Sequence, residues 1–90
     1  MTATQIGQAL KNGKIIQVYD RSDAPKDMWK TAYRLDDIKR GIVTVVDYVS
    51  HNNGVNWVVL RSDHIYRLQL DSCIQNIIQA HYEGCEVVIK

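Results

Sequence analysis

The chain has 90 residues, of which 46% are apolar and 23% are charged, and its net charge is +1. These values are typical of one folded globular domain, which we expect to span residues 1–90, and they exclude a disordered chain. The near-neutral charge also excludes the strong global basic excess of many phosphate-binding proteins, although it leaves local basic patches open.

A short helix over residues 2–11 is the first predicted element. Thr2 and Gln5 have the spacing of a capping box, and the pair Asn12-Gly13 is typical of a helix end. Residues 14–19 then have the apolar and β-branched content of a strand. We therefore expect the chain to open with a helix that leads directly into a strand.

The next segment combines a polar loop with an extended stretch. Residues 20–27 contain the chain's one proline and predict a loop, and residues 28–35 are expected to be extended. Residues 36–41 predict a turn. Two neighbouring carboxylates, Asp36 and Asp37, lie in this turn beside basic residues. We interpret them as turn and cap groups in a solvated charge cluster, in preference to an acid–base pair.

Residues 42–70 predict three consecutive antiparallel strands. The pair Asn53-Gly54 marks the first chain reversal, and Ser62-Asp63 marks the second. Both faces of these strands are rich in aliphatic residues. A free antiparallel sheet in water usually has one apolar and one polar face, so something is expected to cover the second face as well.

The register of the three strands assigns each residue to a face. A two-residue loop pairs Tyr48 with Val59, and a four-residue loop pairs Tyr48 with Trp57. In both cases the even-numbered residues of the first strand share a face with the odd-numbered residues of the second strand. The first face, which we expect to be the core, carries Ile42, Thr44, Val46, Tyr48, Val55, Trp57, Val59, Tyr66, Leu68 and Leu70. The second face carries Val43, Val45, Asp47, Val49, Asn56, Val58, Leu60, Ile65, Arg67 and Gln69.

The second face has the composition of an interface, because aliphatic residues are edged by polar and charged ones. A helix or a protein partner can cover it, and the sequence does not separate the two. Pairing of two copies through this face or through the final strand gives a two-fold dimer. The residues predicted to bind a partner are Val45, Asp47, Val49, Asn56, Val58, Leu60, Ile65 and Arg67.

The chain is expected to close with a helix and a strand. Residues 71–83 have helical spacing of apolar residues, with Asp71 or Ser72 as the cap and Gly84 as the end. Residues 85–90 predict a final strand. The expected fold is therefore an α+β domain with two helices on an antiparallel sheet of five to six strands, in the order α-β-(β)-β-β-β-α-β.

One alternative fold rests on a resemblance. The runs GIVTVVDYV, NWVVLRS and HIYRLQLDS resemble the middle strands of small Sm-like barrels. They lack the glycine and asparagine signatures of the RNA-binding families of that kind. A small Sm-like β-barrel with a terminal helix is thus the alternative architecture.

Metal and cysteine chemistry find little support in the sequence. Cys73, His81 and Cys85 lack the close-pair spacing of zinc ligands, even when His64 is added. Cys73 falls on the apolar stripe of its helix, which predicts burial in place of a reactive thiolate. The glycines are spaced as helix and turn residues and form no phosphate loop. We expect no metal, no cofactor and no enzymatic activity.

Nucleic acid is the alternative ligand. Basic residues alternate with aromatic ones between the predicted loop and turn, and that combination can hold a single strand by stacking and phosphate neutralisation. The ten acidic residues and the expected burial of Trp57 argue against it. The residues of this alternative RNA-binding site are Trp29, Lys30, Tyr33, Arg34, Lys39 and Arg40.

The opening segment IGQALKNGKII, Ile6 to Ile16, resembles the first helix and strand of small phage-encoded domains that sequester a nucleotide signal of bacterial immunity. Those openings also contain Ala-Leu and Asn-Gly-Lys between helix and strand, but the rest of the chain lacks the family's aromatic pocket pattern. The resemblance implies a small phage or mobile-element accessory protein. The resulting prediction is a non-enzymatic protein-binding domain that inhibits a bacterial host or defence factor, with an RNA-binding module as the alternative.

Overall fold

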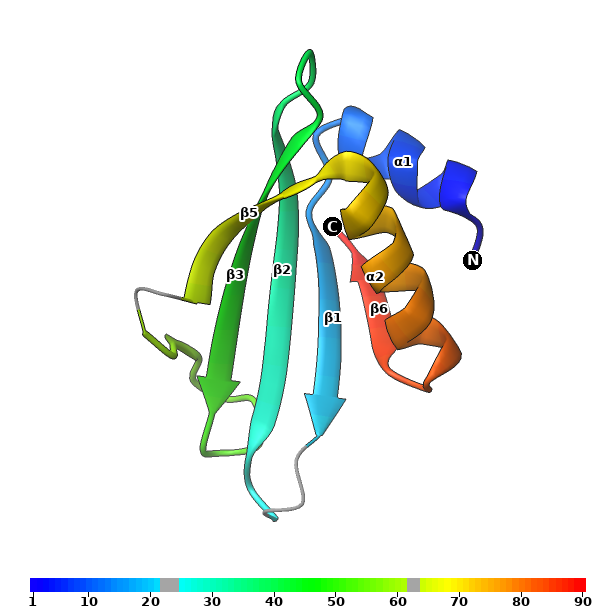
Figure 1. Cartoon of the computed structure of the whole chain (residues 1–90). Coiled ribbons are helices and arrows are strands. Elements are labelled where there is room, and N and C mark those ends of the chain that lie inside the picture. Colours follow the sequence, from blue (N-terminus) through cyan, green and yellow to red (C-terminus); the bar gives the residue numbers. More distant parts are fainter. Residues whose placement is uncertain (22–24, 62–63) are drawn as a thin grey trace.

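Two helices lie on one face of an antiparallel sheet in the computed structural model, which describes residues 1–21, 25–61 and 64–90 (Figure 1). The elements are α1 Ala3–Lys11, β1 Ile16–Arg21, β2 Met28–Asp37, β3 Ile42–Ser50, β4 Val58–Val59, β5 Ile65–Gln69, α2 Leu70–Tyr82 and β6 Glu86–Ile89. This arrangement confirms the predicted α+β class and element order. The sheet is open, so the alternative prediction of an Sm-like barrel is wrong.

The strand order is β4-β3-β2-β1-β6, and β5 pairs with β3 beside β4. The predicted meander is therefore wrong in one respect, because β5 adds directly to β3. The pair Val46–Ile65 shows this register. Of the two pairings that the sequence left open, Tyr48 with Val59 is observed and Tyr48 with Trp57 is not. The second predicted turn, Ser62-Asp63, lies outside the described residues.

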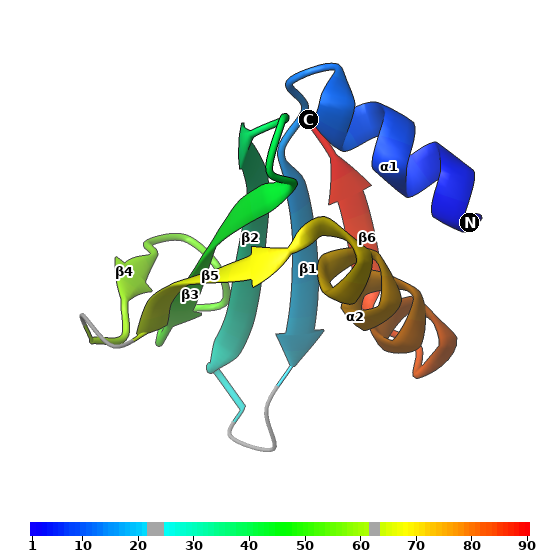
Figure 2. The same cartoon turned by 45° about the horizontal axis from the view of Figure 1, so that its top comes forward.

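The loop between β3 and β4 explains why β4 is so short. The Ser50 hydroxyl accepts a hydrogen bond from the Gly54 N–H at 2.8 Å, and the Asn53 N–H donates to the Lys26 carbonyl at 2.9 Å. Asn53 and Gly54 both have positive φ, as the predicted Asn-Gly turn requires. The loop thus extends across residues 51–57 and leaves most of the β3 edge available to β5 (Figure 2).

Both helices begin near their predicted positions. Thr2 caps α1 through the predicted capping box with Gln5. The predicted side-chain cap of α2 is wrong, because Gln69 is the N-cap residue and makes no side-chain cap bond. The Leu70 N–H instead donates to the Gly41 carbonyl at 2.7 Å, so a tertiary contact satisfies the first turn. Neither of these described helices combines the length and apolar character that crossing a membrane requires.

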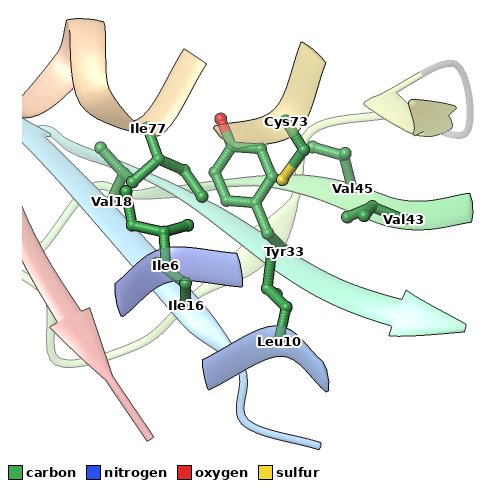
Figure 3. Packing of buried hydrophobic residues seen from close by; sticks show 9 residues of the cluster. All are labelled: Ile6, Leu10, Ile16, Val18, Tyr33, Val43, Val45, Cys73 and Ile77. Atoms are coloured by element: carbon green, nitrogen blue, oxygen red, sulfur yellow. The ribbon is translucent and has the colours of Figure 1, made fainter. Parts of the chain in front are cut away.

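The core lies between the helices and one face of the sheet. Ile6 and Leu10 reach it from α1, and Cys73 and Ile77 reach it from α2 (Figure 3). The buried residues that the sheet contributes are Ile16, Val18, Tyr33, Val43 and Val45. Helices therefore cover the odd-numbered residues of β3, and the sequence prediction that the even-numbered ones form the core is wrong.

Replacing Thr2 with alanine is expected to lower the free energy of unfolding by about 0.5–2 kcal/mol, because the Gln5 N–H loses its side-chain acceptor. Urea denaturation followed by circular dichroism measures the change. Thr4→Ala is the matched control, since Thr4 is exposed within α1 and caps nothing. Equal effects of both substitutions contradict the role of the capping box.

Candidate functional site

No helix or strand among the described residues covers the face of the sheet that points away from the helices; the loop before β4 reaches it through Trp57. The register places Gln17, Ala32, Val46 and Ile65 side by side across β1, β2, β3 and β5. Val88 of β6 continues this row beyond Gln17. We call this surface the uncovered face; its residues are Ile15, Gln17, Tyr19, Lys30, Ala32, Arg34, Thr44, Val46, Tyr48, Ile65, Arg67 and Val88.

Apolar side chains are prominent on the uncovered face. Ile65 is 50% exposed and Ile15 is 37% exposed, although both are large aliphatic residues. A hollow of about 180 Å³ opens beside them; it is lined by Ile15, Ala32, Arg34, Thr44, Val46 and Tyr48. An apolar centre surrounded by a polar rim is the usual composition of a protein interface.

An aromatic group around one lysine lies on the same face. The Lys30 Nζ is 4.5 Å from the ring centroid of Trp57, 5.0 Å from that of Tyr48 and 5.8 Å from that of Tyr19. Tyr19 and Trp57 also pack edge to face, with centroids 5.8 Å apart. We call these four residues the Lys30 cluster. Its rings favour a cation above their faces, because the π system is negative there.

A charged network borders the other end of the face. Asp36 accepts hydrogen bonds from the Thr44 hydroxyl and from the Arg34 Nε, which lies 2.9 Å from the carboxylate. The bond from Thr44, followed by Arg34, holds the pKa of the Asp36 carboxyl below its usual range, although partial burial acts in the opposite direction. Arg67 lies opposite Thr44 on the neighbouring strand. This network fixes Arg34 beside the apolar hollow.

The residues predicted to bind a partner do not form one surface. Val45 is 0% exposed and Val49 is also buried, so neither is available to a partner; the helix-covered face takes the odd positions of β3. Ile65 and Arg67 do lie on the uncovered face, because β5 pairs directly with β3. The remaining predicted residues lie elsewhere: Asp47 belongs to β3, Val58 belongs to β4, and Asn56 and Leu60 lie in the chain on either side of β4.

The residues of the alternative RNA site are also divided. Lys30 and Arg34 lie on the uncovered face, but Tyr33 is 7% exposed and packs in the core. Trp29 lies on the opposite face of β2 from Lys30, since neighbouring strand residues alternate. Lys39 and Arg40 lie in the turn after β2, where both N–H groups donate to the Asp37 carboxylate. These two bonds confirm the interpretation of Asp37 as a turn-capping group.

Asp47 joins three strands on the helix-covered side. Its carboxylate accepts a hydrogen bond from the Thr31 hydroxyl at 2.9 Å and lies 3.1 Å from the His64 Nδ1. The Leu60 N–H also donates to the Asp47 carbonyl. Asp47 thus ties β2 and the start of β5 to β3, which is a structural role for a residue predicted to contact a partner.

Groups suited to metal or thiol chemistry are not assembled. In the part of the chain that the structure describes, no three His, Cys, Asp or Glu side chains gather as a metal site requires. Cys73 and Cys85 are free thiols. Burial raises the pKa of the Cys73 thiol to about 12, so Cys73 is protonated at neutral pH and is not the thiolate that a nucleophile needs.

The raised pKa of Cys73 predicts a loss of stability in base. The unfolded thiol titrates near its ordinary value of about 9, whereas the folded thiol keeps its proton up to about pH 12. Base therefore favours the unfolded state. Stability is full below about pH 9 and falls as the pH rises toward 12, by about 1 kcal/mol from Cys73 alone at pH 10. Urea midpoints at pH 8 and pH 10 measure this change.

The matched control for this prediction is Cys73→Ala, which removes the titrating group. This variant is expected to be less stable at both pH values, because a small cavity forms, but to lose less stability between them. An equal loss in the variant and the wild-type chain assigns the alkaline effect to other groups, such as Tyr33, whose pKa is raised by burial and then by Cys73.

Two larger hollows lie outside the apolar part of the uncovered face. One, of about 330 Å³, is a groove between α1 and α2 with Gly7, Leu70 and Ile74 in its wall. The other, of about 300 Å³, lies at the end of β1, where Tyr19 of the uncovered face meets Asp20, Arg21 and other charged residues. The uncovered face combines aromatic, aliphatic and charged side chains, so it is the better candidate for recognition.

Comparisons of the chain with protein-family models, with curated proteins and with solved structures found no match. Sequence reasoning missed the Lys30 cluster because Tyr48 and Trp57 were assigned to the core. Their spacing on either side of the Asn53-Gly54 turn was the available signal, since the observed Tyr48–Val59 pairing brings Trp57 near Tyr48.

Proposed function

We propose that this protein is a non-enzymatic binding protein that recognises another protein through its uncovered face. The observation that carries the proposal is the row of Val88, Gln17, Ala32, Val46 and Ile65, which is apolar except for Gln17, on a sheet face that no described helix or strand covers. Burial of such a row against a partner removes apolar surface from water, which is the main favourable term in protein association.

Polar and aromatic neighbours support the same proposal. Tyr, Trp and Arg supply most of the residues that dominate binding energy in interfaces. Tyr48, Trp57 and Arg34 border the apolar row and are held in place by contacts within the chain. Pre-ordered side chains lose little conformational freedom on binding, so the face is suited to a partner that docks without remodelling it.

The narrower prediction, inhibition of a bacterial host or defence factor, is part of this proposal, and we place that inhibition in the cytoplasm. The free thiols of Cys73 and Cys85 fit a reducing compartment. The identity of a captured partner tests it.

A second candidate is a module for single-stranded RNA. One observation favours it: Trp57, which was expected in the core, instead lies on the uncovered face with Tyr19 and Tyr48 beside a lysine. Open sheets that bind single strands use exposed rings and cations in this way. Lys30 already lies over these rings, however, so a base has to displace it before it can stack.

A pull-down from nuclease-treated bacterial lysate tests the proposal. Val46→Asp places a charge in the apolar row without touching the helix-covered core, and Thr4→Asp is the matched control on the exposed side of α1. We expect wild type and Thr4→Asp to retain the same protein and Val46→Asp to lose it, while all three keep the same circular dichroism spectrum. Retention by Val46→Asp contradicts the proposal, and loss of capture after nuclease treatment favours RNA.

A further inference from the structure

The Lys30 cluster holds one ammonium group among three rings from different parts of the sheet. Tyr19 comes from β1, Lys30 from β2 and Tyr48 from β3, while Trp57 is contributed by the loop before β4. The three strand residues are direct neighbours, because Tyr19 pairs with Lys30 and Lys30 pairs with Tyr48. The position of the ammonium is therefore set by the sheet itself.

No carboxylate of the described residues compensates the charge of Lys30. Among the described residues, no carboxylate lies within ion-pair distance of its Nζ, and no hydrogen bond from the ammonium is recorded. Burial, followed by the positive charge of Lys90, lowers the pKa of Lys30. The rings attract the cation but accept none of its N–H groups strongly, so the ammonium keeps unused donor capacity.

The uncovered face as a whole carries further positive charges. Arg67 lies on the uncovered face, and Lys90 continues the β6 register beside Ile15, to whose carbonyl its N–H donates at 2.8 Å. Arg34 is paired with Asp36, and Glu86 of β6, which lies opposite Tyr19, is a second carboxylate on this side of the sheet. Cations outnumber carboxylates here, so an acidic ligand is complementary, whereas two copies face to face bring like charges together.

The same contacts favour a protein over a nucleic acid as the ligand. Lys30 lies over the faces of Tyr48 and Trp57, which are the surfaces that bases need for stacking. The hollow beside the cluster is lined by Ala32, Val46 and Ile15, and such aliphatic groups pack against side chains of a protein. A carboxylate beside an apolar side chain matches both parts of the surface.

We propose that Lys30, held among Tyr19, Tyr48 and Trp57, is the anchor for an acidic side chain of the protein partner, next to an apolar side chain that enters the hollow at Val46. This inference rests on the proposed function and adds the chemistry of the partner to it. The carboxylate accepts the hydrogen bonds that the rings cannot, and the partly desolvated setting strengthens that contact.

A random 12-residue peptide library displayed on phage provides a probe with no assumed sequence. It is selected against wild type, Lys30→Met, Lys14→Met and Val46→Asp. Lys30→Met keeps the length and apolar packing of the side chain but removes its charge, and Lys14→Met is the control at an exposed lysine outside the uncovered face. Synthetic copies of the selected peptides are then titrated against each variant.

Wild type and Lys14→Met are expected to select peptides enriched in Asp or Glu next to an apolar residue. Lys30→Met is expected to bind those peptides about tenfold more weakly or worse, and their Asn or Gln analogues are expected to lose as much with wild type. Peptides without acidic enrichment, failure to select any peptide, or unchanged binding by Lys30→Met overturns the inference.

The other variants distinguish a failure of this inference from a failure of the proposed function. If Val46→Asp loses the peptides but Lys30→Met keeps them, the uncovered face binds protein and only the anchor role fails. If Val46→Asp keeps them, the proposed function fails as well. A third outcome assigns RNA as the ligand in place of a protein. In that outcome no peptide is selected, and wild type binds a ten-nucleotide oligouridylate that Trp57→Ala does not bind.

Discussion

Replacement of Val45 by aspartate is expected to prevent the chain from folding. Val45 is fully buried in the cluster that both helices form with the sheet. The substitution removes a buried aliphatic side chain and places a carboxylate among the hydrophobic residues of the core, and the two effects together cost about 5 kcal/mol or more. Domains of this size have little more stability than that. Circular dichroism and thermal denaturation measure the result.

The neighbouring residue provides the control for this prediction. Val46 points to the uncovered face, so Val46→Asp is expected to fold with nearly unchanged stability. A sequence interpretation that places the even positions of β3 in the core predicts the opposite outcome for the two variants. A folded Val45→Asp and an unfolded Val46→Asp therefore contradict the assignment of faces.

The second large effect is expected for Ile77→Ala. Ile77 is fully buried on α2 and packs against the residues that α1 and the sheet contribute to the core (Figure 3). Its truncation leaves a cavity and is expected to lower the free energy of unfolding by about 2–5 kcal/mol. Asn76→Ala, at the exposed neighbouring position, is the control and is expected to change stability by less than about 0.5 kcal/mol. Similar losses in both variants contradict the docking of α2 through Ile77.

Local signals explain why most elements could be predicted from the sequence. The capping box of Thr2 and Gln5 and the positive φ of Gly13 and Gly84 depend on neighbouring residues alone. The bounds of the helices and strands follow such signals within a few residues. The capping of α2 does not follow a local signal, because its first N–H group bonds to Gly41, which is distant in sequence.

The assignment of faces failed because it required a long-range choice. Valine and other apolar residues occupy both parities of β3, so periodicity does not show which side the helices cover. The prediction also assumed that β5 pairs with β4. The observed pairing of Val46 with Ile65 moves Ile65 and Arg67 to the other face relative to β3. The alternation of residues along the strands therefore could not place Ile65 and Arg67 beside Val46.

The most direct test of the account is a methyl spectrum of the isotope-labelled protein with and without its captured partner. We expect the methyl signals of Val46, Ile65 and Val88 to shift or broaden on binding, while those of Val45 and Ile77 stay in place. Perturbation confined to methyl groups on the helices, with Val46 unchanged, contradicts recognition through the uncovered face.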